Sequence, residues 1–310
     1  MNVDAPTAGA VVTLTRPQVL RIQQAIALST VVFPFLGSIL AGVLWFRNGI
    51  SAVEITSLIA MYLLCMLGVT VGLHRLFAHR SFKTGRAMQA LLAVAGSMAA
   101  QGPVLFWVST HRRHHAHSDR EGDPHSPNLH GDGLKGTARG LWFAHIGWMF
   151  DGNLADVGHY AKDVLRDRML FRIHQSYLLW VFLGLLLPAL AGGLLTGTWE
   201  GAFLAFLWGG LVRIFLVNHA SWCVGSICHR FGTRPFDTKD KSANNYTVAV
   251  LAFGEGLQNN HHAFPASYRH AMHWWQPDLS AWVICLMKYT GLAWELRAPS
   301  AQDIQNARAR

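Results

Sequence analysis

Four long apolar stretches dominate the pattern of hydrophobic and polar positions along the chain. They cover approximately residues 25–46, 53–73, 176–198 and 201–223, and the first of them contains no charged residue. A helix needs about 20 apolar residues to cross a hydrocarbon core about 30 Å thick, so each stretch is long enough to span a membrane. The pattern therefore predicts an all-α protein whose four transmembrane helices form two hairpins.

A fifth uncharged stretch, residues 87–108, is not expected to cross the membrane. It is interrupted by Gln101, Gly102 and Pro103, which are poorly suited to a regular span. If it crossed, the histidines at 74–79 and those at 111–117 would lie on opposite sides. We expect instead a helix that dips into the membrane or lies against it and is covered by protein.

Composition and charge agree with a membrane protein and orient it. Charged residues make up 14% of the chain, against about 25% in soluble domains. The net charge is +9, and the segments 74–176 and 223–310 hold 13 and nine of the 26 Lys and Arg residues. The positive-inside rule places both segments and both termini in the cytoplasm. We therefore expect a single domain, 1–310, with a helical cytoplasmic cap formed by 74–175 and 224–298, and a lipid bilayer rather than nucleic acid as the partner.

Histidine is the chemically informative residue type. The chain has 17 histidines, none before residue 74, and they gather in HRLFAH (74–79), HRRHH (111–115) and QNNHH (258–262). Positions i, i+3 and i+4 share one face of an α-helix, so His111, His114 and His115 are expected to converge, whereas His74 and His79 would flank a site. Imidazole is a good ligand for iron, zinc and copper. More imidazoles than one ion can use indicate a site for two ions.

The remaining histidines and nearby acids have less specific expected roles. Three histidines are candidates for supporting the fold or the site: His117, His125 and His145. Five others are expected to be interfacial polar residues: His130, His159, His174, His270 and His273. Four acidic residues are candidates to orient imidazole N–H groups: Asp119, Asp123, Asp237 and Glu255.

Five motifs in this order resemble those of the membrane fatty acid desaturases, in particular the acyl-CoA Δ9 type. They are HRLFAHRSF (74–82), HRRHHAHSDREGDPHSP (111–127), FAHIGW (143–148), CHRFGTRPFD (228–237) and GEGLQNNHHAFP (254–265), within a similarity over residues 25–296. The resemblance implies four membrane helices beneath a cytosolic cap that holds two iron ions. By matching positions it implies eight metal ligands: His74, His79, His111, His114, His115, His229, His261 and His262.

Two positions depart from the family pattern. Many relatives have histidine where Gln258 stands, and asparagine, which contacts iron through water, where Gly225 stands. Gln258 still offers an amide oxygen and is a candidate metal ligand or support. His219 is a second candidate, but it lies ten residues before His229, about 15 Å along a continuous helix. Its alternative role is a hydrogen bond inside the bundle, with Asn218 as the expected partner.

The resemblance also implies the reaction and its partners. The expected activity is O₂-dependent introduction of a cis double bond at the Δ9 position of a fatty acyl-CoA, with an acyl-phospholipid as the alternative substrate. Trp107 and Trp222 are candidates to line the acyl tunnel. The sequence shows no haem, rubredoxin-type or flavin motif, so we expect an external ferredoxin, rubredoxin or cytochrome b5-type donor with its reductase. The expected location is the bacterial inner membrane, with the active site cytoplasmic.

Two other classes of function remain open at this point. A di-iron membrane hydroxylase or alkane monooxygenase would use the same metal chemistry but insert oxygen. A metal transporter or sensor would need polar residues in the middle of its spans to carry ions across. Arg213 and His219 are the main polar residues there, so the sequence favours an enzyme.

Overall fold

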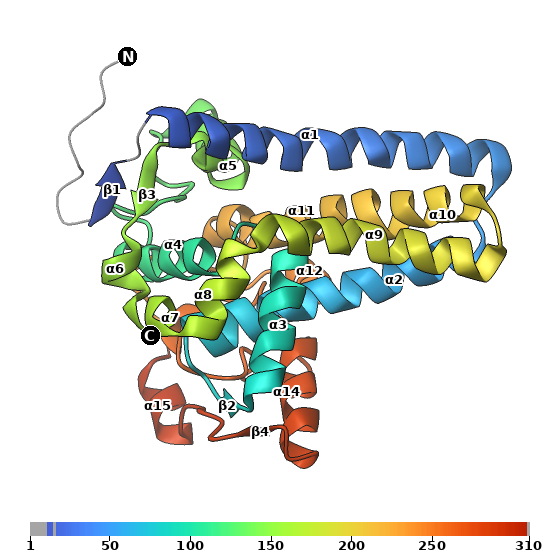
Figure 1. The fold of residues 1–310 in the computed structure, drawn as a ribbon. Helices are drawn as coiled ribbons and strands as arrows, with labels where there is room; N and C mark the ends of the chain where they lie inside the picture. Colours follow the sequence, from blue (N-terminus) through green and yellow to red (C-terminus); the bar gives the residue numbers. More distant parts are fainter. Residues whose placement is uncertain (1–10, 15–16, 309–310) are drawn as a thin grey trace.

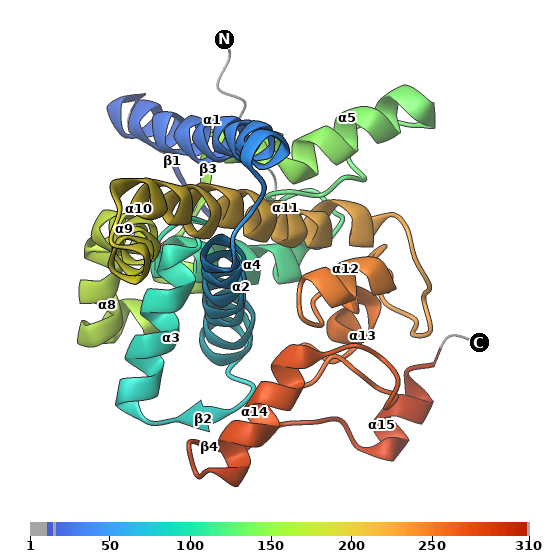
Figure 2. The same ribbon diagram turned by 90° about the vertical axis from the view of Figure 1, so that its right-hand side faces the viewer.

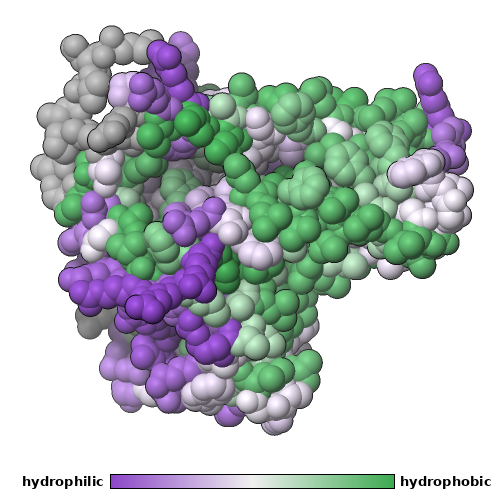
Figure 3. All heavy atoms as spheres, in the orientation of Figure 1, coloured by the Kyte–Doolittle hydropathy of each residue, from purple (hydrophilic) through white to green (hydrophobic). Residues whose placement is uncertain are grey.

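The computed structural model describes residues 11–14 and 17–308. Within them, four helical stretches are long and apolar enough to cross a membrane, which confirms the predicted fold class: Pro17–Asn48, Ala52–Ala78, Tyr177–Thr196 and Trp199–His229. In Figure 1 they extend in one direction from the rest of the molecule and are joined in pairs at their far ends. Figure 3 shows a largely hydrophobic surface over this half and hydrophilic residues over the opposite end.

Each of these stretches is built from named elements. The first is α1 (Pro17–Asn48) and the third is α9 (Tyr177–Thr196). The second begins as α2 (Ala52–Leu67) and continues as the π-helix η1 (Gly68–Ala78). The fourth consists of α10 (Trp199–Ala205), the π-helix η3 (Phe206–Val212), α11 (Arg213–Ser226) and the 3₁₀ turn η4 (Ile227–His229). The second and fourth stretches therefore reach beyond the predicted spans, and His74 and His229 lie in these extensions.

Short helices and two small sheets form the cap (Figure 2). After the second span come α3 (Arg86–Met98), α4 (Val104–His117), α5 (Gly133–His145), η2 (Gly147–Phe150), α6 (Val157–Tyr160), α7 (Lys162–Arg166) and α8 (Arg168–Gln175). After the fourth come α12 (Tyr246–Leu251), α13 (Gln258–Ala263), α14 (Leu279–Tyr289) and α15 (Ala301–Asn306). Strand β1 (Val12–Leu14) pairs antiparallel with β3 (Asn153–Ala155), and β2 (Lys83–Thr84) with β4 (Ala293–Trp294).

The apolar stretch 87–108 is two helices rather than one. Helix α3 ends at Met98, and α4 begins at Val104, directly after Pro103 in the N-cap position. Helix α3 crosses the long helices at a steep angle (Figure 1). It approaches η1 closely because Gly68 and Gly96 meet at the crossing, where an added Cβ on Gly68 would lie 2.2 Å from the Gly96 nitrogen.

A buried arginine in the fourth span satisfies carbonyl groups that the helices leave free. Arg213 is fully buried, and its guanidinium donates to the carbonyls of Met98 and Gly184, each at 2.7 Å. Pro188 lacks the N–H that would bond the Gly184 carbonyl four residues earlier in α9. Met98 is the last residue of α3, whose terminal carbonyls lack helical partners. This cation therefore holds three helices together and has a structural role inside the membrane.

Candidate metal centre

The clustered histidines come from four parts of the chain that the fold brings to one place. His74 lies on η1 and His79 directly after it, three histidines lie on α4, His229 ends η4, and His261 and His262 lie on α13. All of them are at the cap ends of the second and fourth spans or in the adjacent cap helices. Their ring nitrogens form two neighbouring groups.

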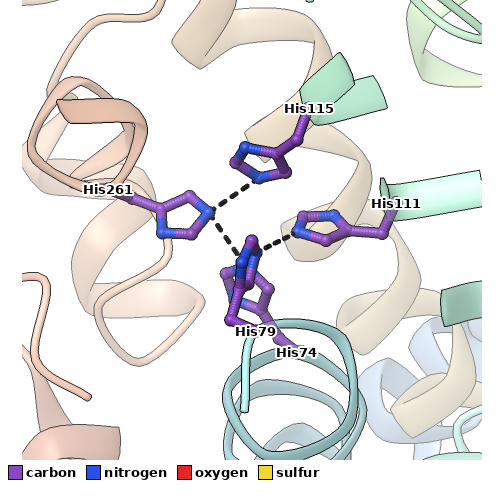
Figure 4. Close-up of side chains that lie close together, drawn as sticks. All are labelled: His74, His79, His111, His115 and His261. Atoms are coloured by element: carbon purple, nitrogen blue, oxygen red, sulfur yellow. Dashed lines mark hydrogen bonds between the residues drawn. The ribbon is translucent and has the colours of Figure 1, made fainter. Parts of the chain in front are cut away.

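The first group contains five imidazoles, whose ligand atoms all lie within 4.8 Å of one another: His74, His79, His111, His115 and His261. Figure 4 shows these rings converging from three elements. The Nε2 atom of His261 lies 3.1 Å from that of His74 and 2.9 Å from that of His115, and the Nε2 atoms of His79 and His111 are 2.7 Å apart. Two cis ligands each about 2.1 Å from a metal are about 3 Å apart, so the spacing fits one ion.

The second group contains three imidazoles, His114, His229 and His262. Their rings are close to mutually perpendicular, with centroids 4.8–5.3 Å apart and interplanar angles of 72–77°. The Nε2 atom of His114 is buried and has no hydrogen-bond partner. Since His115 of the first group stacks on His262 with centroids 4.5 Å apart, the two groups are direct neighbours.

The helical geometry departs from the sequence prediction in two places. His111, His114 and His115 do not converge on one site, because His111 and His115 point into the first group and His114 into the second. His74 and His79 do not flank a site but share the first group, with ring centroids 4.8 Å apart. The cause is the π-helix: the His79 N–H donates to the His74 carbonyl five residues earlier, at 3.0 Å, which places residues five apart on the same side.

Carboxylates fix the rings of the second group, as three Nδ1 contacts show. The Nδ1 atoms of His114, His229 and His262 lie 3.0, 2.8 and 2.6 Å from Asp123, Asp119 and Asp240 respectively. In the first group, His74 Nδ1 contacts Glu255. A carboxylate on one ring nitrogen fixes the tautomer and leaves the other nitrogen free for a metal.

The structure confirms three of the four acids predicted to orient imidazoles and corrects the fourth. Asp119, Asp123 and Glu255 have this role, whereas Asp237 is exposed and does not. Its place is taken by Asp240, three residues later in the same loop, where hydrogen bonds from Ser242 also hold the carboxylate. No spacing in the sequence distinguishes these two aspartates, because the loop has no helical or strand period.

The electrostatics keep the groups in the ionisation states that a metal requires. Although burial raises it, the pKa of Asp119 is held well below its usual range by hydrogen bonds from His229, Asn128 and Ser126. In the first group, burial and then the neighbouring imidazoles hold the pKa values of four histidines well below 6.5: His79, His111, His115 and His261. These imidazoles are therefore neutral at pH 7 and present lone pairs.

The arginines between the histidines hold the segments in place. Arg112 donates to the carbonyls of Phe77 and Ala78 at the end of η1 and to Asp163. Arg75 is fully buried and bonds Glu255, the partner of His74. Arg112 thus ties the HRRHH motif to the HxxxxH motif, and Arg75 ties the HxxxxH motif to the segment that precedes α13.

His125 and His270 lie beside these groups, whereas His145 and His219 contact each other. His270, expected at an interface, is instead buried, with its ring centroid 4.4 Å from that of His261. His219 lies apart from both groups, and its Nδ1 is 3.0 Å from Nε2 of His145 rather than bonded to Asn218. His145 also contacts Ser226 Oγ, and His125 stacks on His114 with centroids 4.5 Å apart.

An apolar cavity of about 400 Å³ leads to the metal groups. It runs from α1, at Ile22 and Ile26, to His114 and Gln258, and both predicted tunnel tryptophans line it: Trp107 and Trp222. Trp107 stacks on His111 and donates from Nε1 to Gln101, whose amide in turn donates to Ser221 at 2.8 Å. Sequence reasoning did not identify Gln101 and Ser221, because single polar residues within apolar stretches carry no motif.

The donor set fits two metal ions. Eight buried or half-buried histidines point ring nitrogens at two neighbouring positions, and hydrogen bonds between the rings can pair only some of those lone pairs. Histidine-rich sites with carboxylate support and an open side suit iron, copper or zinc. The described residues contain no cysteine among these ligands.

Comparisons with known proteins agree with this geometry. The sequence profile of the family described as "Fatty acid desaturase" matches residues 51–284. The chain is 48% identical over 276 residues to hex-5-enoyl-[acyl-carrier protein] acetylenase of Moorena producens, covering 88% of this chain and 86% of that protein.

Two further relatives have different named substrates. The chain is 41% identical to the sn-1 stearoyl-lipid 9-desaturase of Anabaena variabilis, over 73% of this chain and 77% of that protein. It is 39% identical to the acyl-CoA C20 Delta5-desaturase of Anemone leveillei, over 78% of this chain and 73% of that protein. These relatives therefore share a scaffold but differ in acyl carrier and in the position of the bond.

Proposed function

Because the chain belongs to the fatty acid desaturase family, an oxidoreductase family of membrane proteins, we propose that it introduces a cis double bond into a fatty acyl chain with O₂ as the oxidant. The observation that carries the proposal is the convergence of eight buried or half-buried histidines at the end of an apolar cavity. The reaction would remove two hydrogens from adjacent methylenes. It would also consume two electrons and two protons from outside, and reduce O₂ to two waters.

In this proposal the eight histidines hold two irons, which when bound supply the redox chemistry needed to break unactivated C–H bonds. The four carboxylates keep the Nε2 atoms turned toward the ions. The cavity holds the acyl chain beside the metal groups and excludes water from them. The hydrogen-bonded unit of Trp107, Gln101 and Ser221 fixes the wall of the cavity next to His111 and so determines which methylenes lie there.

The acyl carrier and the bond position are the finer parts of the proposal. Acyl-CoA desaturated at Δ9 is the first substrate to test, and an acyl-phospholipid the second. Where animal relatives carry an Arg-Asp pair for CoA, this chain has Ser109 and Thr110, and both are buried. Arg113, on the adjoining cavity, is occupied by the carbonyls of Gly122 and Asn153. The described residues at this position therefore offer no free cation for phosphates, which favours testing lipid and carrier-protein donors alongside CoA.

An external electron donor is the remaining partner in the proposal. The backbone N–H of exposed Lys241 donates to Asp119 at 2.8 Å, and Asp119 contacts His229, so one carboxylate separates the surface from a metal ligand. Three other exposed basic residues are close in sequence to Asp119, His229 or Lys241: Arg120, Arg230 and Lys239. An acidic ferredoxin, rubredoxin or cytochrome b5-type protein would be steered to such a surface. Under this proposal the cap faces the cytoplasm, at a bacterial inner membrane.

Expression in a host of defined lipid composition, followed by mass spectrometric localisation of new double bonds, tests the function. The expected product is lighter by two hydrogens, whereas a hydroxylase would add the mass of one oxygen. The His114→Ala variant should form no product and should lose iron from the second group, since it removes one of the three imidazoles there. Full activity in that variant would overturn the proposed site.

Formation of a triple bond is a second candidate, favoured by the 48% identity to an acetylenase. The same metal groups would then act on a chain that is already unsaturated. Feeding saturated and terminally unsaturated acyl chains in parallel distinguishes the two functions. An acetylenase loses two hydrogens from the unsaturated chain, and a desaturase acts on the saturated one.

A further inference from the structure

Gln258 is the one amide side chain that faces the second histidine group among the residues described. It begins α13, one helical turn before His262, and is 3% exposed. Its Nε2 atom lies 3.1 Å from Nε2 of His262 and 3.4 Å from Nε2 of His229. Its Oε1 atom is buried and has no hydrogen-bond partner. The side chain thus has a defined position but an incomplete set of partners.

The carboxylates determine what Gln258 faces. Because Asp119 and Asp240 accept from the Nδ1 atoms of His229 and His262, the Nε2 atoms of both rings carry lone pairs. Without an ion, the amide NH₂ of Gln258 is the group that can donate to those lone pairs. An ion bound there takes the lone pairs and repels the NH₂. Half a turn about the last side-chain bond then exchanges nitrogen for oxygen without moving the backbone.

We infer that Gln258 is a direct ligand, through its amide oxygen, of the ion held by His114, His229 and His262. The inference rests on the proposed function, which supplies the two irons. The two ions then have unlike surroundings, with five imidazoles around one and three imidazoles plus a neutral oxygen around the other. An amide oxygen is a harder and weaker donor to iron than imidazole.

Helix α11, which lies next to the second group, adds no ligand to it. Gly225 on α11 lines the cavity and has no side chain to add a ligand. A Cβ there would lie 3.3 Å from Nδ1 of His125, and that nitrogen is itself buried without a partner. Three imidazoles and Gln258 leave more positions free on this ion than five imidazoles leave on the other. The open positions face the cavity, where His114 and Gln258 form part of the wall.

Substitution of Gln258, read out by iron content and Mössbauer spectroscopy on isotope-enriched protein, tests the inference. The wild type should bind two irons per chain and give two distinct quadrupole doublets. Gln258→Leu removes one ligand and leaves only three imidazoles at that position, so it is expected to bind that ion more weakly and to lose up to half of the iron, with the loss confined to one doublet. Gln258→His should keep both irons and shift that same doublet, since imidazole replaces the amide.

A matched control distinguishes the loss of a metal ligand from a general effect of removing an amide side chain from the cavity. Gln23→Leu removes an amide that lines the same cavity on α1 but donates to the Met149 carbonyl, so it should keep both irons and the wild-type spectrum. If Gln258→Leu and Gln258→His both keep two irons and the wild-type doublets, Gln258 is not a ligand. Should the leucine variant fail to fold, the spectrum of the histidine variant alone gives the answer. Product formation by the wild type is measured separately, so a chain that shows this iron pattern without product overturns the function and not the ligand.

Discussion

The two histidine groups are built on different principles although they lie side by side. The first gathers five imidazoles, of which His74 has a carboxylate on its Nδ1. The second has three imidazoles, each with its own aspartate. In the proposed centre, one group would gain metal affinity from the number of ligands, and the other from ligand basicity and orientation. A count of histidines in the sequence therefore does not indicate how tightly each ion would be held.

Removing one histidine from each group should give the largest difference in iron content between the two groups. His262→Ala leaves two imidazoles in the second group, so we expect loss of roughly half of the iron and at least about 100-fold of the activity. His115→Ala leaves four imidazoles in the first group and should retain more iron. Iron per chain after gel filtration measures both variants. Equal iron loss would show that the two groups do not differ in redundancy.

Removing a carboxylate should affect the second group by a smaller factor. Asp240→Asn takes the anion from His262 Nδ1 while keeping the size of the side chain, and should weaken iron binding there by roughly 10–100-fold. A chelator titration followed by iron analysis measures the change. Asp237→Asn, in the same loop but exposed, is the matched control and should match the wild type. A larger loss in the control would mean that the loop, rather than the carboxylate, matters.

Acidification should release iron from the two groups at different pH values. Burial lowers the pKa of His114, but the Asp123 carboxylate more than offsets this and raises it above 6.5. The pKa values of His79, His111 and His115 are lowered well below that value. Burial lowers the pKa of His262, also in the second group, to about 4, so it is at His114 that protons compete with the metal at higher pH than in the first group. Iron retained after equilibration between pH 7 and 4 should fall in two steps, and a single step would contradict the comparison.

The four spans and the histidine motifs could be predicted from the sequence, because each follows from a local physical constraint. Apolar length fixes the four spans, because the thickness of a membrane imposes it. The spacing of HxxxxH and HRRHH predicts metal ligands, but the expected arrangement of the rings assumed α-helical winding. The π-helix η1 brings His74 and His79 together, so the predicted arrangement was wrong there.

Residues without a local pattern could not be placed. Asp240 acts from an irregular loop, and His270 is buried by contacts with distant segments. His229 was found only by resemblance to the family, since a single histidine at a helix end has no distinguishing spacing. Long-range contacts of this kind depend on the whole fold, which the periodicity of one segment does not encode.

Substitution of Arg213 should have the smallest effect on iron binding, because this residue lies in the helical bundle and not among the histidines. Arg213→Met leaves the carbonyls of Met98 and Gly184 without their donor, at a cost of about 1–3 kcal/mol each. We expect a lower thermal midpoint in detergent, with iron content and Mössbauer doublets unchanged. Loss of the second ion alone would instead show that its retention depends on bundle stability, and the contrast between the groups would then not reflect their ligands.

Substitution of Pro188 tests whether Arg213 acts through the Gly184 carbonyl. Pro188→Ala restores the N–H four residues after Gly184, so the Gly184 carbonyl regains a helical donor. In that background Arg213→Met should lose about 1 kcal/mol less than it does alone, because one of the two carbonyls no longer depends on the arginine. A double-mutant cycle on thermal midpoints measures this coupling. Additive effects would mean that Arg213 stabilises the bundle through packing, not through the carbonyl that the proline leaves free.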